Sequence, residues 1–301
     1  MKNTNFLLCR NPLEPKSPDF GYENEYGVIR KAGYVPKLFD FDSFISGEKV
    51  AMPTAEEHTK LIYRGWMMKP ETYERFYEVL SQNRCILVNS PKQYRFCHTL
   101  PGWYDVLSDL TPKSRWTEDL SDAAIMTILH EFGDRPVIIK DYVKSRKHEW
   151  LEACFIPDAS NTKQAMQVIR HFLDRQGDDL VGGLVVREFV RLKEAGLHPK
   201  SGMPISEEYR AFFLDGKQIC IIDYWNGTSA VSVEIKAFAD QVAKKVQSNF
   251  FTVDIARTAD DKLIVMEIGD GQVSGLQGFS EMEFYRKLFD VMGSSQILWT
   301  C

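Results

Sequence analysis

The sequence lacks the signatures of several common classes of protein. Its six cysteines include no Cys-x-x-Cys pair, so we expect no zinc site and reduced thiols. No stretch approaches the roughly 20 apolar residues that a membrane helix needs, and the first apolar run is too short for a signal peptide. A net charge of -5 gives no overall basic field that would attract nucleic acid. We therefore expect a cytoplasmic protein with no membrane association and no clear nucleic-acid partner.

The composition is that of a globular protein, and the pattern of elements changes along the chain. At 301 residues and 44% hydrophobic content, the chain can bury an ordinary core. Strands alternate with helices over residues 1–112, which predicts a small parallel α/β domain. The segment "SDLTPKSRW" around Pro112 marks a boundary. Hairpins and separate helices over residues 113–301 predict an α+β domain, with subdomains at roughly 113–190 and 191–301.

Two apolar runs near the C-terminus each contain one acid, Asp254 in "FFTVDIA" and Glu267 in "KLIVMEI". The acidic turn "TADDK" between them predicts a hairpin. If its two aspartates form a two-residue loop, Ala259 pairs with Lys262 and Asp254 faces Glu267. A divalent cation would relieve the repulsion of such a pair, and without metal the loss of either charge should keep or raise the melting temperature. The alternative is a solvent-facing acidic pair on an ordinary hairpin.

Lys140 follows "VII" in an apolar strand, where a lysine is costly to bury without an anion. Strand lysines that point at nucleotide phosphates are one recurrent solution. Lys144 lies four residues further on, and strand alternation would place both lysines on one face if the strand continues that far. The alternative is an edge-strand lysine that blocks aggregation.

Three further segments combine polar residues with strands. Arg187 and Glu188 end the apolar run "LVV", where a strand could line an adenine pocket or carry a surface salt bridge. Arg210 begins a predicted hairpin and could clamp a phosphate or carboxylate with two parallel bonds. Asp270 lies among glycines in "EIGDGQVSG", where the backbone can approach a ligand closely.

The order of these features resembles the ATP-grasp superfamily, and the resemblance covers most of the chain. The segments "LLCR", "IYRGW", "VIIKDYVKS" and "MEIGDGQVSGL" are similar to the R2K clade of that superfamily. The resemblance implies an α+β ATP-grasp fold, in which two α+β subdomains hold ATP between antiparallel sheets, preceded by a small α/β domain. ATP and Mg²⁺ are the implied cofactors.

The resemblance also assigns roles by motif position. Lys140 and Lys144 would contact the phosphates of ATP, and Glu188, Phe189 and Val190 would form the adenine hinge. Arg210 would reach the γ-phosphate or an acyl-phosphate, and Asp254 and Glu267 would hold Mg²⁺. The arginine for which the clade is named corresponds to Arg10 or to Arg64.

The sequence departs from the family in one place. Most ATP-grasp enzymes have Glu-x-Asn, with the Asn as a further metal ligand, but here Glu267 is followed by Ile268 and Gly269. Asp270 comes one position later and would have to turn in at a glycine kink. The departure puts the second metal ion in doubt more than the first.

The implied activity is an ATP-dependent ligase that forms a C–N bond through an acyl-phosphate and releases ADP and phosphate. Its substrate would be a peptide, an amino acid or another small molecule. No nucleophilic triad is apparent, and this chemistry needs none. A small-molecule kinase is an alternative, but no Gly-rich loop precedes the strand lysine and no His-Arg-Asp motif follows. A non-catalytic nucleotide-binding protein is a second alternative.

Overall fold

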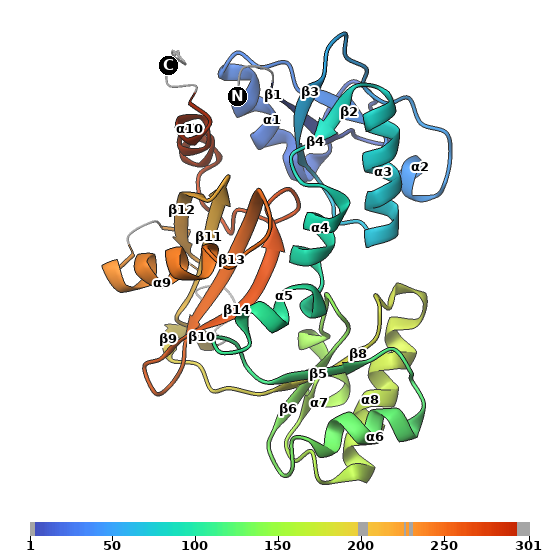
Figure 1. Cartoon of the computed structure of the whole chain (residues 1–301), viewed down its shortest axis with the longest axis vertical. Helices are drawn as coiled ribbons and strands as arrows, with labels where there is room; N and C mark the ends of the chain where they lie inside the picture. The colour runs from blue at the N-terminus through green and yellow to red at the C-terminus, as the bar shows by residue number, and fades with distance from the viewer. Residues whose placement is uncertain (1–3, 198–203, 226, 229–230, 294–301) are drawn as a thin grey trace. The chain divides into compact units, whose positions relative to one another are not determined.

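The computed structural model describes residues 4–197, 204–225, 227–228 and 231–293, and the chain divides into two compact units. Unit 1 contains residues 1–97, 208–255 and 268–301, and unit 2 contains residues 98–207 and 256–267. Figure 1 labels the elements of both units. Each unit combines stretches that are distant in the sequence. The expected boundaries after residues 112 and 190 stay predictions.

The N-terminal part of unit 1 is a parallel sheet, as the alternation of strands and helices predicted. Its strands β1 (Thr4–Cys9), β2 (Lys37–Phe39), β3 (Thr59–Arg64) and β4 (Cys85–Leu87) lie in the order β2-β1-β3-β4, and every neighbouring pair is parallel. The chain between and after them forms α1 (Glu23–Lys31), α2 (Phe41–Ile45), α3 (Pro70–Gln82) and α4 (Pro91–His98). Pro70 stands at the first position of α3, where a missing N–H is harmless.

A second sheet follows later in the chain. It contains β11 (Glu208–Leu214), β12 (Lys217–Asp223), β13 (Phe250–Arg257) and β14 (Leu263–Asp270), in the order β12-β11-β13-β14. Asp215 and Gly216 join β11 to β12, and both have the positive φ that a tight hairpin turn requires. The hairpin predicted to begin near Arg210 is therefore confirmed. Helices α9 (Val233–Ala243) and α10 (Glu281–Val291) belong to the same unit.

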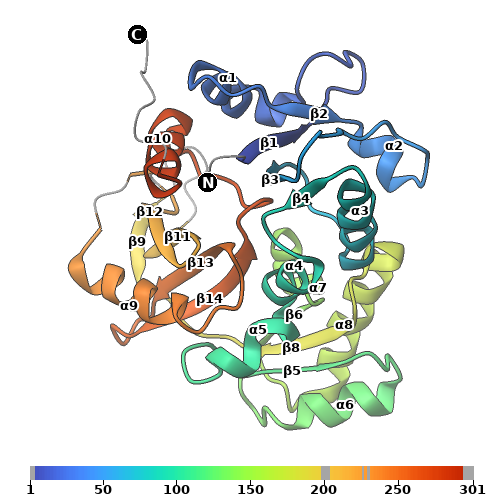
Figure 2. The ribbon, with the colours of Figure 1, turned by 45° about the horizontal axis from the view of Figure 1, so that its top comes forward.

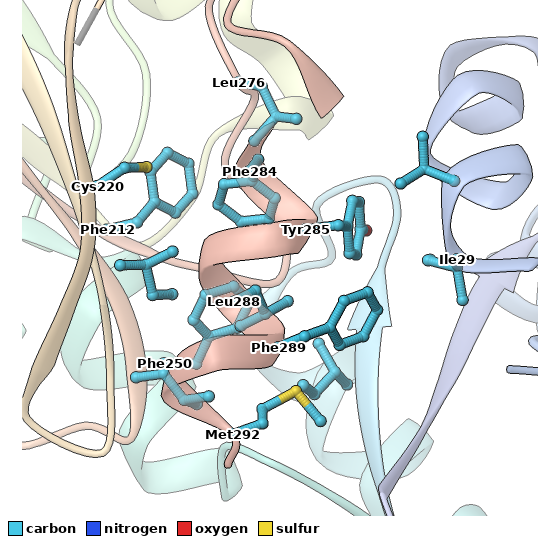
Figure 3. Packing of buried hydrophobic residues seen from close by; sticks show 14 of the residues in the cluster. Ile29, Phe212, Cys220, Phe250, Leu276, Phe284, Tyr285, Leu288, Phe289 and Met292 are labelled. Atoms are coloured by element: carbon cyan, nitrogen blue, oxygen red, sulfur yellow. The ribbon is translucent and has the colours of Figure 1, made fainter. Parts of the chain in front are cut away.

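The apolar stripe of α10 organises one core of unit 1 (Figure 3). Phe284, Tyr285 and Leu288 are fully buried in a cluster that takes residues from both sheets. Phe6 of β1 packs edge-on against Tyr285, and Phe212 of β11 packs edge-on against Phe284. The last helix thus stabilises strands from the beginning and from the later part of the chain.

Unit 2 is built on an antiparallel sheet. Strands β5 (Ser114–Thr117), β8 (Leu184–Glu188), β6 (Val137–Lys140) and β7 (Phe155–Ile156) lie in the order β5-β8-β6-β7. The unit also contains α5 (Leu100–Leu107), α6 (Asp122–His130), α7 (Trp150–Ala153), α8 (Thr162–Gln176) and the hairpin of β9 (Glu194–Leu197) and β10 (Pro204–Ser206). Apolar residues of α6 and α8 pack on β6 and β8, and both helices lie beside the sheet in Figure 2. Antiparallel sheets with separate helices confirm the predicted α+β class.

The structure also shows the state of the cysteines, the burial of several aromatic side chains and the character of the helices. The described cysteines, Cys9, Cys85, Cys97, Cys154 and Cys220, are buried and unpaired, whereas Cys301 lies outside the described residues. The aromatic side chains of Tyr63, Tyr94, Trp103 and Tyr104 are buried, whereas that of Trp66 is 46% exposed. Among the described helices, none has the length and apolar character needed to span a membrane.

Candidate functional site

Lys140 ends β6 with its ammonium group almost enclosed. Its side chain is 12% exposed, and the nearest carboxylate oxygen, on Glu267, lies 3.9 Å away, too far for a hydrogen bond. Among the described residues the Lys140 ammonium has no hydrogen-bond partner. Burial lowers the pKa of Lys140, while Glu267 opposes that shift and Arg187 adds to it. Such a buried cation favours an incoming anion.

Lys144 does not lie on the same strand face as Lys140, because the strand stops at Lys140. The chain reverses there: the N–H of Asp141 donates to the carbonyl of Lys144 at 2.9 Å, and Lys140 forms an antiparallel bridge with Ser145. The conditional expectation of a continuous strand through Lys144 is therefore wrong. Aspartate favours such turns because its side chain bonds the backbone two residues on, and Asp141 does so. Lys144 itself is exposed.

Arg187 is buried rather than part of a surface pair. Its Nη2 donates to the Thr111 hydroxyl at 2.9 Å and to the carbonyl of Met266 at 3.0 Å, and its guanidinium lies 5.9 Å from the centroid of the Trp103 ring. Burial lowers the pKa of Arg187 to about 10, and Glu267 opposes the shift. Arg187 therefore fixes β14 next to Glu267, a role that the sequence did not reveal.

The predicted adenine hinge begins with Glu188, the last residue of β8, and continues through Phe189 and Val190. The N–H of Glu188 donates to the carbonyl of Lys113 at 2.8 Å, and the N–H of Phe189 donates to the carbonyl of Pro136 at 3.0 Å. The Glu188 carboxylate pairs with Arg135 at 3.1 Å. Phe189 packs edge-on against Phe155, with 5.0 Å between ring centroids. These contacts hold the segment in one conformation.

A hollow of about 500 Å³ lies beside this segment within unit 2. Its lining residues are Phe189, Arg191, Leu192, Lys193, Glu194 and Ala259. Phe189 thus contributes to the hollow, whereas Glu188 and Val190 are not among the lining residues. One apolar ring at an open hollow with charged walls suits a flat, polar ligand such as a base.

Arg210 and Asp254 face each other in unit 1. Nε and Nη2 of Arg210 donate to Oδ1 and Oδ2 of Asp254 at 2.8 and 2.7 Å. A third donor, Nη1, reaches the carbonyl of Gly275 at 3.0 Å, and the guanidinium lies 5.1 Å from the Tyr224 ring centroid. Asp254 thus has a cationic partner already, which removes the reason to expect a gain in stability when its charge is lost.

The turn between β13 and β14 has one more loop residue than predicted. The N–H of Thr258 donates to the carbonyl of Lys262 at 2.8 Å, so the loop contains Ala259, Asp260 and Asp261. Only Asp261 has a positive φ, of 60°. A two-residue loop of the favoured kind needs two such residues, which Asp-Asp supplies poorly, whereas a three-residue loop needs one.

At the far end of the same hairpin, the N–H of Gly271 donates to the carbonyl of Phe250 at 3.0 Å. This pairing is the one that the predicted register requires. The alignment of Asp254 with Glu267 stays a prediction.

Asp270 is fully buried in unit 1. Its Oδ2 accepts from Asn89 Nδ2 at 2.6 Å, and its Oδ1 accepts from the N–H and the side-chain amide of Gln272. Burial raises the pKa of Asp270 to about 6, although these donors oppose the shift. Both oxygens have protein partners, and its role as a metal ligand stays a prediction.

The two candidates for the clade arginine have different surroundings. Arg10 pairs with Asp40 at the ends of β1 and β2. Arg64 is 1% exposed and binds both oxygens of Glu25 at 2.8 Å. Its Nη1 also donates to the carbonyls of Gly271 and Ser274, at 2.6 and 2.9 Å, and thereby anchors the glycine-rich segment after β14.

The comparisons with known proteins agree on one family. Residues 131–288, more than half of the 301 residues, match the family described as ATP-grasp domain, R2K clade family 3. A search of curated proteins finds no match.

Several solved structures share the fold. The D-cycloserine synthetase DcsG has a TM-score of 0.63 and 13% identity, over 95% of this chain and 99% of that one. A RimK domain protein ATP-grasp from Sphaerobacter thermophilus has a TM-score of 0.61 and 13% identity, over 93% and 97%. The macrocyclase MdnC from Microcystis aeruginosa, bound with the precursor peptide MdnA, has a TM-score of 0.57 and 12% identity, over 97% and 100%. At 12–13% identity these structures show a shared fold only, whereas the family match is a similarity of the sequence. The chain belongs to the R2K clade of ATP-grasp proteins.

Proposed function

We propose that the protein is an ATP-dependent ligase that activates a carboxylate as an acyl-phosphate and transfers the acyl group to an amine in the cytoplasm. The observation that carries the proposal is the Lys140 ammonium, which is nearly enclosed and has no hydrogen-bond partner among the described residues. A buried ammonium in this state is stabilised most by an anion with several oxygens, such as a phosphate chain. Membership of the ATP-grasp clade makes ATP the natural source of that anion.

The remaining roles are assigned residue by residue. Lys144, exposed and without an ion pair among the described side chains, would contact a phosphate as a point charge. Glu188, Phe189 and Val190 would hold the adenine. Arg210 would present its guanidinium to the γ-phosphate or the acyl-phosphate, which requires it to share Asp254 with that ligand.

The donor set partly suits Mg²⁺. Among the described residues no three His, Cys, Asp or Glu side chains form a ready-made metal cluster. Glu267 is 44% exposed, so its oxygens are accessible, and Asp254 keeps lone pairs beyond those that Arg210 uses. We propose that Glu267 and Asp254 hold Mg²⁺, which neutralises phosphate charge when bound. Asp270 would join them only by giving up a donor, Asn89 or Gln272.

The chemistry then needs positioning and charge neutralisation rather than a protein nucleophile. A carboxylate oxygen of the substrate would attack the γ-phosphorus, and ADP would leave. The amine would attack the acyl carbon, the C–N bond would form, and inorganic phosphate would leave with the former carboxylate oxygen. Lys140 and Arg210 would stabilise the negative charge on the transferred group. The relative that binds a precursor peptide makes a peptide substrate the first to test, followed by amino acids.

The test is to incubate the protein with Mg-ATP and pools of peptides or amino acids, and to measure ADP, phosphate and product mass. A ligase releases ADP and phosphate in equal amounts and yields a product lighter by one water than the sum of its substrates. ADP release with a phosphorylated product would instead identify a kinase. Binding of ATP without any ADP release over all pools would favour a non-catalytic nucleotide-binding protein. Lys140→Met and Arg210→Lys variants, checked for folding, separate true turnover from a contaminant.

A further inference from the structure

Asp141 occupies the turn between the two lysines and is fully buried. Its Oδ1 accepts hydrogen bonds from the N–H groups of Val143 and Lys144, at 2.6 and 2.5 Å. Its Oδ2 accepts from Gln176 Nε2 at 2.9 Å and from the N–H of Val181 at 3.3 Å. A carboxylate with four donors fixes the segments that supply them, on both sides of the turn.

The exposed Lys144 side chain has no ion pair within the described part of the chain, so its position depends on its backbone. Two bonds hold that backbone to Asp141: the N–H of Lys144 donates to Oδ1, and its carbonyl accepts from the Asp141 N–H. The bridge of Lys140 with Ser145 closes the same turn. The place of Lys144 relative to Lys140 therefore follows from the Asp141 carboxylate.

Gln176, at the end of α8, sets the orientation of this carboxylate. Its Oε1 accepts from Nη1 of Arg146 at 3.1 Å, which leaves its Nε2 for Asp141. Arg146 in turn donates to the carbonyl of Arg175 at 3.2 Å and pairs with Glu149. If the Gln176 amide were rotated by half a turn, its NH₂ group would face the N–H of Arg146 and its oxygen would face the Asp141 carboxylate. The observed orientation avoids both repulsive contacts.

We propose that Asp141 is a positioning residue that, through this turn, holds the Lys144 ammonium where it meets the phosphates of a bound nucleotide. The proposal rests on the proposed function, because it assigns Lys144 a phosphate contact. Asp141 itself touches no ligand in this scheme. Its burial beside Lys140 also places a negative charge that favours the charged form of that lysine.

The test is a double-mutant cycle of Asp141→Asn and Lys144→Ala, read as the affinity for a non-hydrolysable ATP analogue with Mg²⁺ by calorimetry. Asparagine turns an NH₂ group toward one side of the turn, so the two N–H donors on that side lose their acceptor. We expect Asp141→Asn to weaken binding at least about tenfold, the factor that corresponds to a single unsatisfied donor. In the Lys144→Ala background the same change should have no further effect. Effects that multiply in the double variant would overturn the proposal.

A rescue variant separates positioning from general damage. When Asp141→Asn is combined with Gln176→Glu, the carboxylate introduced on α8 can accept from both the new amide and Arg146. The amide oxygen then stays with the N–H groups of Val143 and Lys144, and only the 3.3 Å bond from the N–H of Val181 is lost. This pair should recover most of the affinity lost by Asp141→Asn alone. Asp158→Asn is the matched control, because Asp158 closes a turn onto the N–H of Ser160 at 2.9 Å and should leave nucleotide affinity unchanged. Failure of the rescue pair to recover affinity while it folds normally would count against the proposal.

The outcomes also separate this inference from the proposed function. If Lys144→Ala binds the nucleotide as the parent does, the phosphate contact of Lys144 is wrong and the inference falls with it. If Lys144→Ala weakens binding and Asp141→Asn does not, only the role of Asp141 is wrong. Should Asp141→Asn fail to fold, Gln176→Ala removes a single donor from the carboxylate. Gln176→Ala should weaken nucleotide binding by less than the tenfold expected of Asp141→Asn. It should have this effect in the parent protein but not in the Lys144→Ala variant.

Discussion

Replacing Asp254 by asparagine should destabilise the protein, contrary to what two facing carboxylates alone would predict. Asp254 accepts two charge-assisted bonds from Arg210, at 2.8 and 2.7 Å, and the two side chains are 13% and 11% exposed. Asparagine keeps one acceptor oxygen and turns an NH₂ group toward the other guanidinium donor. A hydrogen bond to a charged group contributes about 1.5–3 kcal/mol. Losing one such bond and the opposite charge should lower the free energy of unfolding by about 2–3 kcal/mol.

Urea unfolding followed by circular dichroism measures this change. Asp261→Asn is a matched control, since Asp261 pairs with Lys193 at the same 2.7 Å, but the two side chains are 70% and 46% exposed. Solvent screens such a pair, so the control should unfold almost as the parent does. An Asp254→Asn variant at least as stable as the parent would refute the reasoning.

Three more predictions follow from buried charges. Burial, with Lys144 and Lys140 nearby, lowers the pKa of His98 to about 4, so the folded protein binds fewer protons than the unfolded chain between about pH 4 and 6.5. Stability should fall as the pH drops through this window, by up to about 3 kcal/mol, and His98→Gln should flatten the profile of unfolding free energy against pH. Lys140→Met should keep or raise the stability of the nucleotide-free protein and abolish thermal stabilisation by ATP analogues; equal stabilisation of variant and parent would contradict this. Arg64→Met should lower the free energy of unfolding by about 3–5 kcal/mol in urea titrations, because it leaves the Glu25 carboxylate buried without a cation.

The long periodic segments were predictable from the sequence, because their apolar spacing reports burial directly. Helices α3, α8 and α10 bury residues at helical spacing, such as Tyr73, Phe76 and Leu80 of α3. Short elements such as α2 and β7 contain too few residues to show a repeating pattern of apolar positions. Their conformation is determined by tertiary contacts, which the sequence does not reveal. The parallel sheet was also predictable, since strands and helices alternate over its length.

The sequence indicated which side chains belong to the candidate site, but not which residues they contact. Lys140 stood out because a cation interrupts an apolar strand, and its burial bears out that reasoning. The sequence could not indicate that Arg210 meets Asp254, or that Arg64 meets Glu25 and Tyr285 meets Glu25 across 260 positions. Asp141 did carry a signal, because an aspartate directly after a strand favours a turn. The loop of the β13–β14 hairpin depended on the φ of a single residue, Asp261.

The core around α10 has a consequence for synthesis of the chain on the ribosome. Phe6 and Ile62 emerge early, yet the helix that covers them, at residues 281–291, is made more than two hundred residues later. Until α10 has been synthesised, one apolar face of the N-terminal sheet stays uncovered, and exposed apolar surface promotes aggregation or chaperone binding. By contrast, residues 98–207, with the four strands of the β5-β8-β6-β7 sheet, can begin to fold as they emerge. A nascent chain arrested before residue 281 should therefore protect its middle from protease sooner than its beginning.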